Sequence, residues 1–185
     1  MKKHISTAVV FFTSLLGFLF LGLPFITLAG EATSGYDFLK EVKQFPTKEL
    51  ESAFNTTKVA VIFLIVLFSV AMVYCIVKLL IDLKVIKIKN TAWTEWVNLA
   101  LVVLITIFAI VAICGVSSYV AELNKYYKAF ADAAGAIGGI IGVNTQVPKV
   151  SVGYGIISAL VVYCLTLAVE IAWVVILSLK KSNKK

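Results

Sequence analysis

The stretch VAVIFLIVLFSVAMVYCIVKLLIDL, residues 59–83, decides the fold. Only Lys78 and Asp82 are charged in it, and both lie in its second half. A helix of about 20 apolar residues crosses the roughly 30 Å hydrocarbon core of a membrane. Because lipid offers no hydrogen bonds, the backbone must satisfy its own, and a helix is expected despite the many β-branched residues.

Three further apolar runs have the same character, at residues 6–29, 97–121 and 152–179. Hydrophobic residues make up 61% of the chain, more than the 45–50% usual in soluble domains. We therefore predict a single all-α domain over residues 1–185, an integral membrane four-helix bundle. It would have outer loops at 30–58 and 122–151 and an inner loop at 84–96.

The distribution of lysine predicts the orientation, because cytoplasmic loops carry the excess of basic residues. With both termini inside, the inner side holds ten lysines and two acids, and the outer side holds seven of each. This bias explains the net charge of +7 without a nucleic-acid partner. All 17 basic residues are lysine, a bias typical of AT-rich bacterial genomes, and we expect a multi-pass protein of a bacterial cell membrane.

The first apolar run has two interpretations. Met1-Lys2-Lys3, a long apolar stretch and Thr27-Leu28-Ala29 resemble a secretory signal peptide with its cleavage site. The length of the apolar stretch favours a retained span. The orientation of the other three runs is the same in both cases.

The outer loops are expected to contain short ordered segments. The sequence predicts one helix near 36–45 and a second near 47–54, which Pro46 separates, with Thr47 as a candidate N-cap. The second helix can run directly into the span at 59–83. In the other loop, the glycine spacing around residues 129–147 predicts either a segment that packs on the bundle or a flexible glycine loop.

Glu170 is the most unusual residue, because a carboxylate within a membrane span is costly unless it is paired or hydrated. It shares one helical face with Tyr163, Thr166 and Trp173, so this face should point into the bundle. Such a residue is either an ion or proton site or a clamp between helices. Without a lysine partner, Glu170 would bond to a hydroxyl such as that of Thr13 or Thr106.

Lys78 is the expected partner of Glu170, because both lie in the inner halves of spans that run in the same direction. The alternatives are that Lys78 extends its ammonium group to the inner interface or pairs with Asp82 one turn away. The candidate polar site is therefore Glu170, Lys78, Tyr163 and Thr166.

No catalytic pattern accompanies this candidate site. His4 is the only histidine, and no phosphate-binding loop or nucleophile-elbow motif occurs in the sequence. We therefore expect no enzyme activity, no cofactor and no metal.

Two short motifs resemble small uncharacterised four-span bacterial membrane proteins. Leu23-Pro24-Phe25 leaves the first span, and Ser34-Gly35-Tyr36-Asp37-Phe38-Leu39 follows it. Those proteins carry an LPF exit and an SGFDLL-like turn at the same places. The resemblance implies four spans but no particular activity.

Two functions remain open at this point. One is a non-enzymatic accessory, scaffolding or protective subunit that acts on a membrane partner through its outer loops and helix faces. The alternative is a channel or carrier subunit that uses Glu170 as an ion or proton site within a homo-oligomer.

Overall fold

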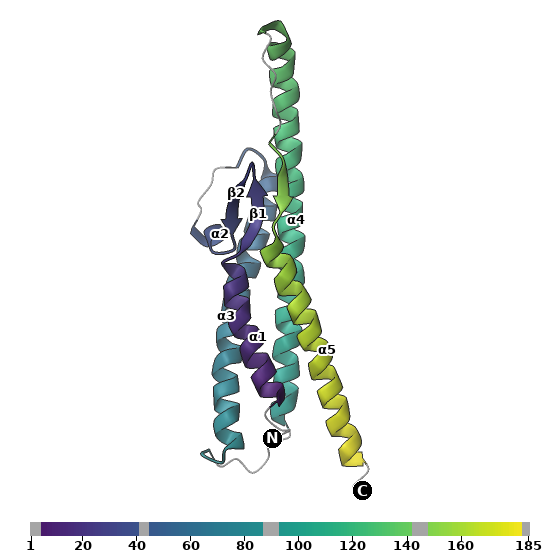
Figure 1. Cartoon of the computed structure of the whole chain (residues 1–185). Helices are drawn as coiled ribbons and strands as arrows, with labels where there is room; N and C mark the ends of the chain where they lie inside the picture. The colour runs from purple at the N-terminus through teal and green to yellow at the C-terminus, as the bar shows by residue number, and fades with distance from the viewer. Residues whose placement is uncertain (1–4, 41–44, 87–92, 142–147, 183–185) are drawn as a thin grey trace.

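The computed structural model describes residues 5–40, 45–86, 93–141 and 148–182, and it is mostly helical (Figure 1). Four long helices run along one another, and a small sheet and a short helix lie beyond one end of α1. In chain order the elements are α1 (Ile5–Leu21), β1 (Pro24–Leu28), β2 (Glu31–Ser34), α2 (Asp37–Lys40), α3 (Lys48–Asp82), α4 (Trp93–Ile141), β3 (Val150–Val152) and α5 (Tyr154–Ser182).

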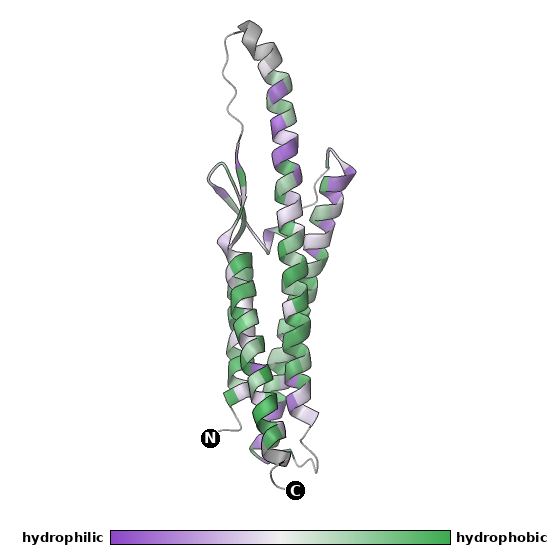
Figure 2. Cartoon of the chain, turned by 90° about the vertical axis from the view of Figure 1, so that its right-hand side faces the viewer, coloured by the Kyte–Doolittle hydropathy of each residue, from purple (hydrophilic) through white to green (hydrophobic). Residues whose placement is uncertain are grey.

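Three of the described helices, α3, α4 and α5, are long and apolar enough to cross a membrane. The fourth, α1, is apolar but has only 17 residues, about 25 Å of helix at 1.5 Å per residue. Figure 2 shows that hydrophobic residues dominate the bundle, whereas hydrophilic residues appear where α3 begins and along the far part of α4. The prediction of a mostly helical chain with apolar helices long enough to cross a membrane is thus confirmed.

The expectation of an all-α fold is wrong, because three strands form an antiparallel sheet in the order β2-β1-β3. The first apolar run was predicted as a helix through residue 29, yet α1 ends at Leu21. Pro24 has no backbone N–H to continue a helix, and the β-branched Ile26 and Thr27 suit the strand that follows. Ile26 pairs with Val152 across 126 positions of sequence, a contact that no local pattern announces.

A two-residue turn joins β1 to β2. Ala29 has φ 49° and Gly30 has φ 93°, so both residues lie in the left-handed region. This matches a type I′ hairpin turn, which follows the natural twist of the two strands. The turn fixes the register in which Leu28 faces Glu31.

The segments before α3 follow the sequence in part. Thr47 is the N-cap of α3, and its hydroxyl accepts a hydrogen bond from the backbone N–H of Leu50 at 3.3 Å. The helix then continues without a break into the apolar span, as the sequence allowed. The helix expected near 36–45 is present only as α2, and residues 41–44 lie outside the described part of the chain.

The segment at 122–151, predicted as an outer loop, is helical over its first twenty residues, because α4 continues to Ile141; its place outside a membrane stays a prediction. The 49 residues of α4 correspond to about 73 Å, more than twice the thickness of the hydrocarbon core. At its base this part of α4 is bonded to β3, because the side chain of Asn124 donates to the backbone oxygen of Val150 and accepts from its backbone N–H; farther on, the helix rises beyond the sheet (Figure 1). Residues 129–141 are therefore helical and not a loop, the residues from Ala129 to Gly135 are half-buried or exposed, and residues 142–147 lie outside the description.

An aromatic cluster closes the end of the bundle next to the sheet, and its members are Phe25, Phe38, Phe45, Phe54 and Tyr119. The rings of Phe38 and Phe54 stack with centroids 5.2 Å apart, and Tyr119 of α4 meets Phe38 edge-on at 5.8 Å. These contacts join β1, α2, α3 and α4 in one apolar layer.

The middle of the bundle depends on close helix packing at Gly17. A Cβ atom at this position would overlap the hydroxyl of Tyr163 and the ring of Phe68. Those two rings stack with centroids 5.4 Å apart. Gly17 therefore lets α1 approach α3 and α5 directly.

Candidate functional site

The face of α5 that carries Glu170 points into the bundle, as the spacing predicted. Glu170 is fully buried, and Tyr163 and Thr166 on the same face are 1% and 3% exposed. A carboxylate in this position is enclosed by its own chain rather than by lipid.

Glu170 is tied to two other helices through Ser6. The Ser6 hydroxyl donates to Glu170 Oε2 at 2.8 Å and accepts from the Asn98 side-chain amide at 3.1 Å. One serine at the start of α1 thus links α5 to α4. The expected contact with a span-one hydroxyl is present, but it comes from Ser6 and not from Thr13.

Lys78 has a different partner from the predicted one. Its side chain is fully buried, and its Nζ lies 2.9 Å from Oε1 of Glu95 in the first turn of α4. The expected ion pair with Glu170 is therefore wrong, and so is the alternative that Lys78 reaches the inner interface. The sequence reading assigned Glu95 to the inner loop, whereas the helical hairpin of α3 and α4 brings it beside Lys78.

Two of the four predicted site residues lie elsewhere. The Tyr163 hydroxyl donates to the backbone oxygen of Thr13 at 2.8 Å, and the Thr166 hydroxyl donates to Val162 in its own helix at 2.9 Å. Within the described part of the chain, neither bonds to Glu170. Tyr163 and Thr166 are packing residues of the bundle.

The residues that do converge form what we call the inner polar cluster: Ser6, Lys78, Glu95, Asn98 and Glu170. They come from all four long helices. The sequence analysis did not select Ser6, Glu95 or Asn98. A signal was present for the last two, because Glu95 and Asn98 are three residues apart and so share one face of α4.

Some oxygens of the inner polar cluster have no hydrogen-bond partner. Among the described residues these include Glu170 Oε1, Asn98 Oδ1 and Glu95 Oε2, all of them buried atoms. Buried polar atoms without partners are uncommon in proteins, since each costs about 1–3 kcal/mol of desolvation. The described residues contain no group of three His, Cys, Asp or Glu side chains that would hold a metal ion.

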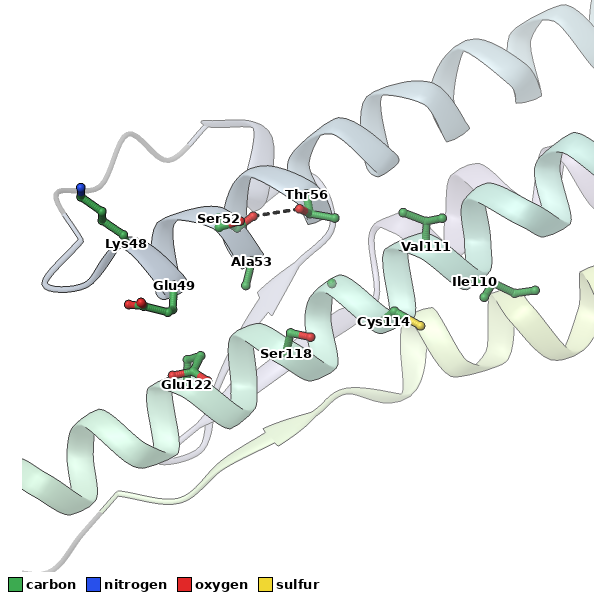
Figure 3. A pocket seen from close by; sticks show the side chains of 11 residues that line it. Lys48, Glu49, Ser52, Ala53, Thr56, Ile110, Val111, Cys114, Ser118 and Glu122 are labelled. Carbon is green, nitrogen blue, oxygen red and sulfur yellow. Dashed lines mark hydrogen bonds between the residues drawn. The ribbon is translucent and has the colours of Figure 1, made fainter.

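A separate groove of about 670 Å³ opens between the beginning of α3 and the middle of α4 (Figure 3). Lys48, Glu49 and Glu122 lie at its charged end, and Ile110 and Val111 lie at its apolar end. The Thr56 hydroxyl in its wall donates to the backbone oxygen of Ser52 at 2.9 Å. That bond commits the Thr56 proton to its own helix.

A second hollow of about 500 Å³ lies at the base of the α4 extension, which we define as residues 122–141. One wall consists of Tyr119, Leu123, Tyr126 and Tyr127 of α4, and the other consists of Leu28, Phe45, Pro46 and Leu50. The hollow is lined mainly by aromatic and aliphatic side chains. Its composition suits the docking of an apolar side chain or helix.

Comparison with protein-family models, with curated proteins and with solved structures found no match to this chain. A function is therefore inferred from four features of the structure: the inner polar cluster, the groove between α3 and α4, the hollow beside Tyr126, and the α4 extension.

Proposed function

We propose that this chain is a non-enzymatic integral membrane protein, an accessory or scaffolding subunit that holds a partner outside the membrane against the α4 extension. The observation that carries the proposal is the length of α4, which projects beyond the sheet as a single helix. A helix without neighbours gains nothing from tertiary packing, which supplies most helical stability in proteins. A partner would supply that packing.

The side chains of α4 support a helical partner. Val116 and Val120 are buried in the bundle core, and the same face continues with Leu123, Tyr127 and Phe130 at alternating steps of three and four residues. Phe130 is 63% exposed. This spacing is the stripe that packs against a second helix in coiled coils.

The charged residues of the extension leave this stripe free. Glu122, Lys125, Lys128 and Asp132 fall outside the positions of the stripe, and Lys125 pairs with Glu122 within the helix. The hollow beside Tyr126 and Tyr127 adds aromatic surface, which is enriched at the centres of protein interfaces. A partner helix along the stripe would fill this hollow.

The proposal includes the full topology of four spans, with both termini in the cytoplasm of a bacterial cell. The start of α1, the end of α3, the start of α4 and the end of α5 lie at one end of the bundle, and the sheet lies at the other (Figure 1). The excess of lysine belongs to that first end. The 17 residues of α1 meet the lower limit of spanning length.

Cysteine-accessibility labelling in intact cells tests the topology. Single cysteines at Ser34 and Asn144 should react with a membrane-impermeant reagent from outside, and those at Asn90 and Ser182 should not. Labelling of position 182 from outside would overturn the orientation.

Site-specific photo-crosslinking tests the partner surface. A photoreactive residue at Phe130 should yield a discrete adduct in intact membranes, whereas the same residue at Asp132, on the charged face, should not. Mass spectrometry of the adduct identifies the partner. Equal adducts at the two positions, or none at either, would contradict the proposal, as would purification only as a solitary monomer in mild detergent.

The alternative of a channel or carrier subunit rests on the unpartnered Oε1 of Glu170. The complete burial of this side chain within one chain favours the role of a clamp between helices. Liposomes containing the purified protein decide between the two roles. Proton or cation flux that Glu170→Gln abolishes would support the alternative, and flux that is absent or unchanged would reject it.

A further inference from the structure

In the described part of the chain, the inner polar cluster leaves buried polar atoms of both kinds without a hydrogen-bond partner: Lys78 Nζ, which is in ion-pair contact with Glu95, and the oxygens Glu170 Oε1, Asn98 Oδ1 and Glu95 Oε2. Ser6 has one hydroxyl proton, which it gives to Glu170 Oε2, and the amide of Asn98 donates to the Ser6 oxygen. Glu170 Oε1 and Asn98 Oδ1 remain without a donor among the described residues. Both side chains are fully buried, and both bond to the same serine, Ser6.

The charges of the cluster are also unequal. The only buried ammonium group in it belongs to Lys78, and that group pairs with Glu95. Among the residues that the structure describes, Glu170 makes no ion pair. An ionised Glu170 is therefore a buried negative charge that lacks a direct counter-charge, an arrangement that costs several kcal/mol.

We propose that the inner polar cluster binds a small monovalent cation such as Na⁺ between Glu170, Asn98 and Ser6. The available ligands are carboxylate, amide and hydroxyl oxygens, which are the ligands that hard cations prefer. One ion of charge +1 balances Glu170 and gives both free oxygens a partner. A divalent ion fits less well, because a single carboxylate would leave it with a surplus positive charge in a buried position.

The position of the cluster allows an ion to reach it. Ser6 lies in the first turn of α1, and the side chain of Glu95 is 21% exposed at the inner end of the bundle. A cation could therefore enter from the cytoplasmic side in the proposed topology. When bound, it would fasten α1, α4 and α5 together, independently of any partner at the α4 extension.

Thermal unfolding of the purified full chain in detergent tests this site. The melting temperature is measured in increasing NaCl, with choline chloride added to keep the ionic strength constant at fixed pH. A ligand that binds only the folded state raises stability as RT ln(1 + [L]/Kd), so the melting temperature should rise with the logarithm of the Na⁺ concentration. The wild-type titration needs no variant to fold.

Two matched variants locate the effect. Glu170→Gln keeps the shape of the side chain but removes its charge, and it should abolish the Na⁺-dependent shift. Glu122→Gln, in the outer half of α4, removes a carboxylate far from the cluster and should leave the shift intact. Together they separate binding at the cluster from a general salt effect.

Three results would overturn the proposal. The first is a melting temperature that is the same in NaCl and in choline chloride, which would leave the free oxygens to water. The second is a shift that Glu170→Gln does not reduce. The third is a melting temperature that rises at lower pH and does not depend on the cation, which would mean that Glu170 binds a proton and no metal ion.

Discussion

The two ends of the bundle are held together by opposite kinds of contact. At the inner end, Lys78, Glu95, Ser6 and their neighbours join four helices through directed polar contacts. At the end next to the sheet, aromatic rings such as Phe38 and Phe54 join β1, α2 and two long helices through ring contacts. The stability of the polar end should depend on the chemical identity of each side chain, and that of the aromatic end should depend on the volume that its side chains fill.

The largest effect is expected at Lys78. The change Lys78→Met should lower the free energy of unfolding by about 4 kcal/mol, because it leaves the Glu95 carboxylate without the buried ammonium group. Adding Glu95→Gln to the same chain should restore part of the loss. Thermal unfolding in detergent measures both, and Lys128→Met on the exposed face of α4 is the control.

The same double-mutant cycle distinguishes the two possible partners of Lys78. Its coupling energy with Glu95 should exceed its coupling energy with Glu170, because only Glu95 is in contact. Strict additivity between Lys78 and Glu95 would contradict the ion pair.

The next effect concerns the aromatic end. Phe38 is 1% exposed, and Phe38→Ala should cost about 3 kcal/mol through the cavity that it leaves. Phe38→Leu should cost less than about 1.5 kcal/mol, because much of the volume is kept. Phe130→Ala on the exposed extension should change stability by less than about 0.5 kcal/mol. A loss from Phe38→Leu as large as that from Phe38→Ala would show that the rings need specific geometry after all.

Two glycine substitutions should have smaller effects on stability, one a loss and the other a gain, and they test the packing between the two ends. Gly17→Ala should destabilise by about 1–3 kcal/mol, because the new methyl group overlaps Tyr163 and Phe68. Gly135→Ala should stabilise by about 0.5–1 kcal/mol, because no atom lies within 4 Å of the added carbon and alanine favours helix. Urea unfolding of both variants measures the difference, and a gain at Gly17 would rule out the close approach of α1.

The smallest effect concerns Asp37 beside the aromatic end. Hydrogen bonds from the Ser34 hydroxyl and backbone N–H hold the pKa of the Asp37 carboxyl below its usual value of 3.8. A lowered folded-state pKa stabilises the protein fully above the unfolded value, and this contribution is lost as the pH falls through the folded one.

Wild type should therefore be slightly more stable than Asp37→Asn at neutral pH, and the difference should shrink below about pH 4. Melting temperatures measured from pH 3 to 7 would test this, with Asp132→Asn as the control on the α4 extension. A difference that is constant over this range would mean that the Ser34 contacts do not depend on the carboxylate charge.

Hydropathy predicted the centres of α3, α4 and α5 but not their ends. Hydropathy identifies the apolar segments alone, whereas α3 begins at Lys48 and α4 continues to Ile141, so both helices extend beyond the apolar runs from which they were predicted. The sheet was missed because β1 depends on β3 from the other end of the chain. Within the local sequence, only Pro24 and Gly30 indicated that the helix ends and a strand and turn follow.

The candidate site was predicted for one residue and not for its neighbours. The face of Glu170 followed from helical periodicity, which is a local property. Its bond to Ser6 spans 164 positions and depends on which helices are adjacent in the bundle. Periodicity says nothing about adjacency, so Lys78 was assigned to the wrong carboxylate.

The continuity of α4 has a mechanical consequence. Asn98, which bonds to Ser6, and Phe130, whose ring is exposed, belong to one uninterrupted helix. They are 32 residues apart, or about 48 Å at 1.5 Å per residue. A helix of this kind converts a sideways force at its tip into a small rotation at its foot, with the aromatic cluster as the fulcrum. A force applied to the exposed end of α4 would therefore act on the same helix that holds a hydrogen bond of the inner polar cluster.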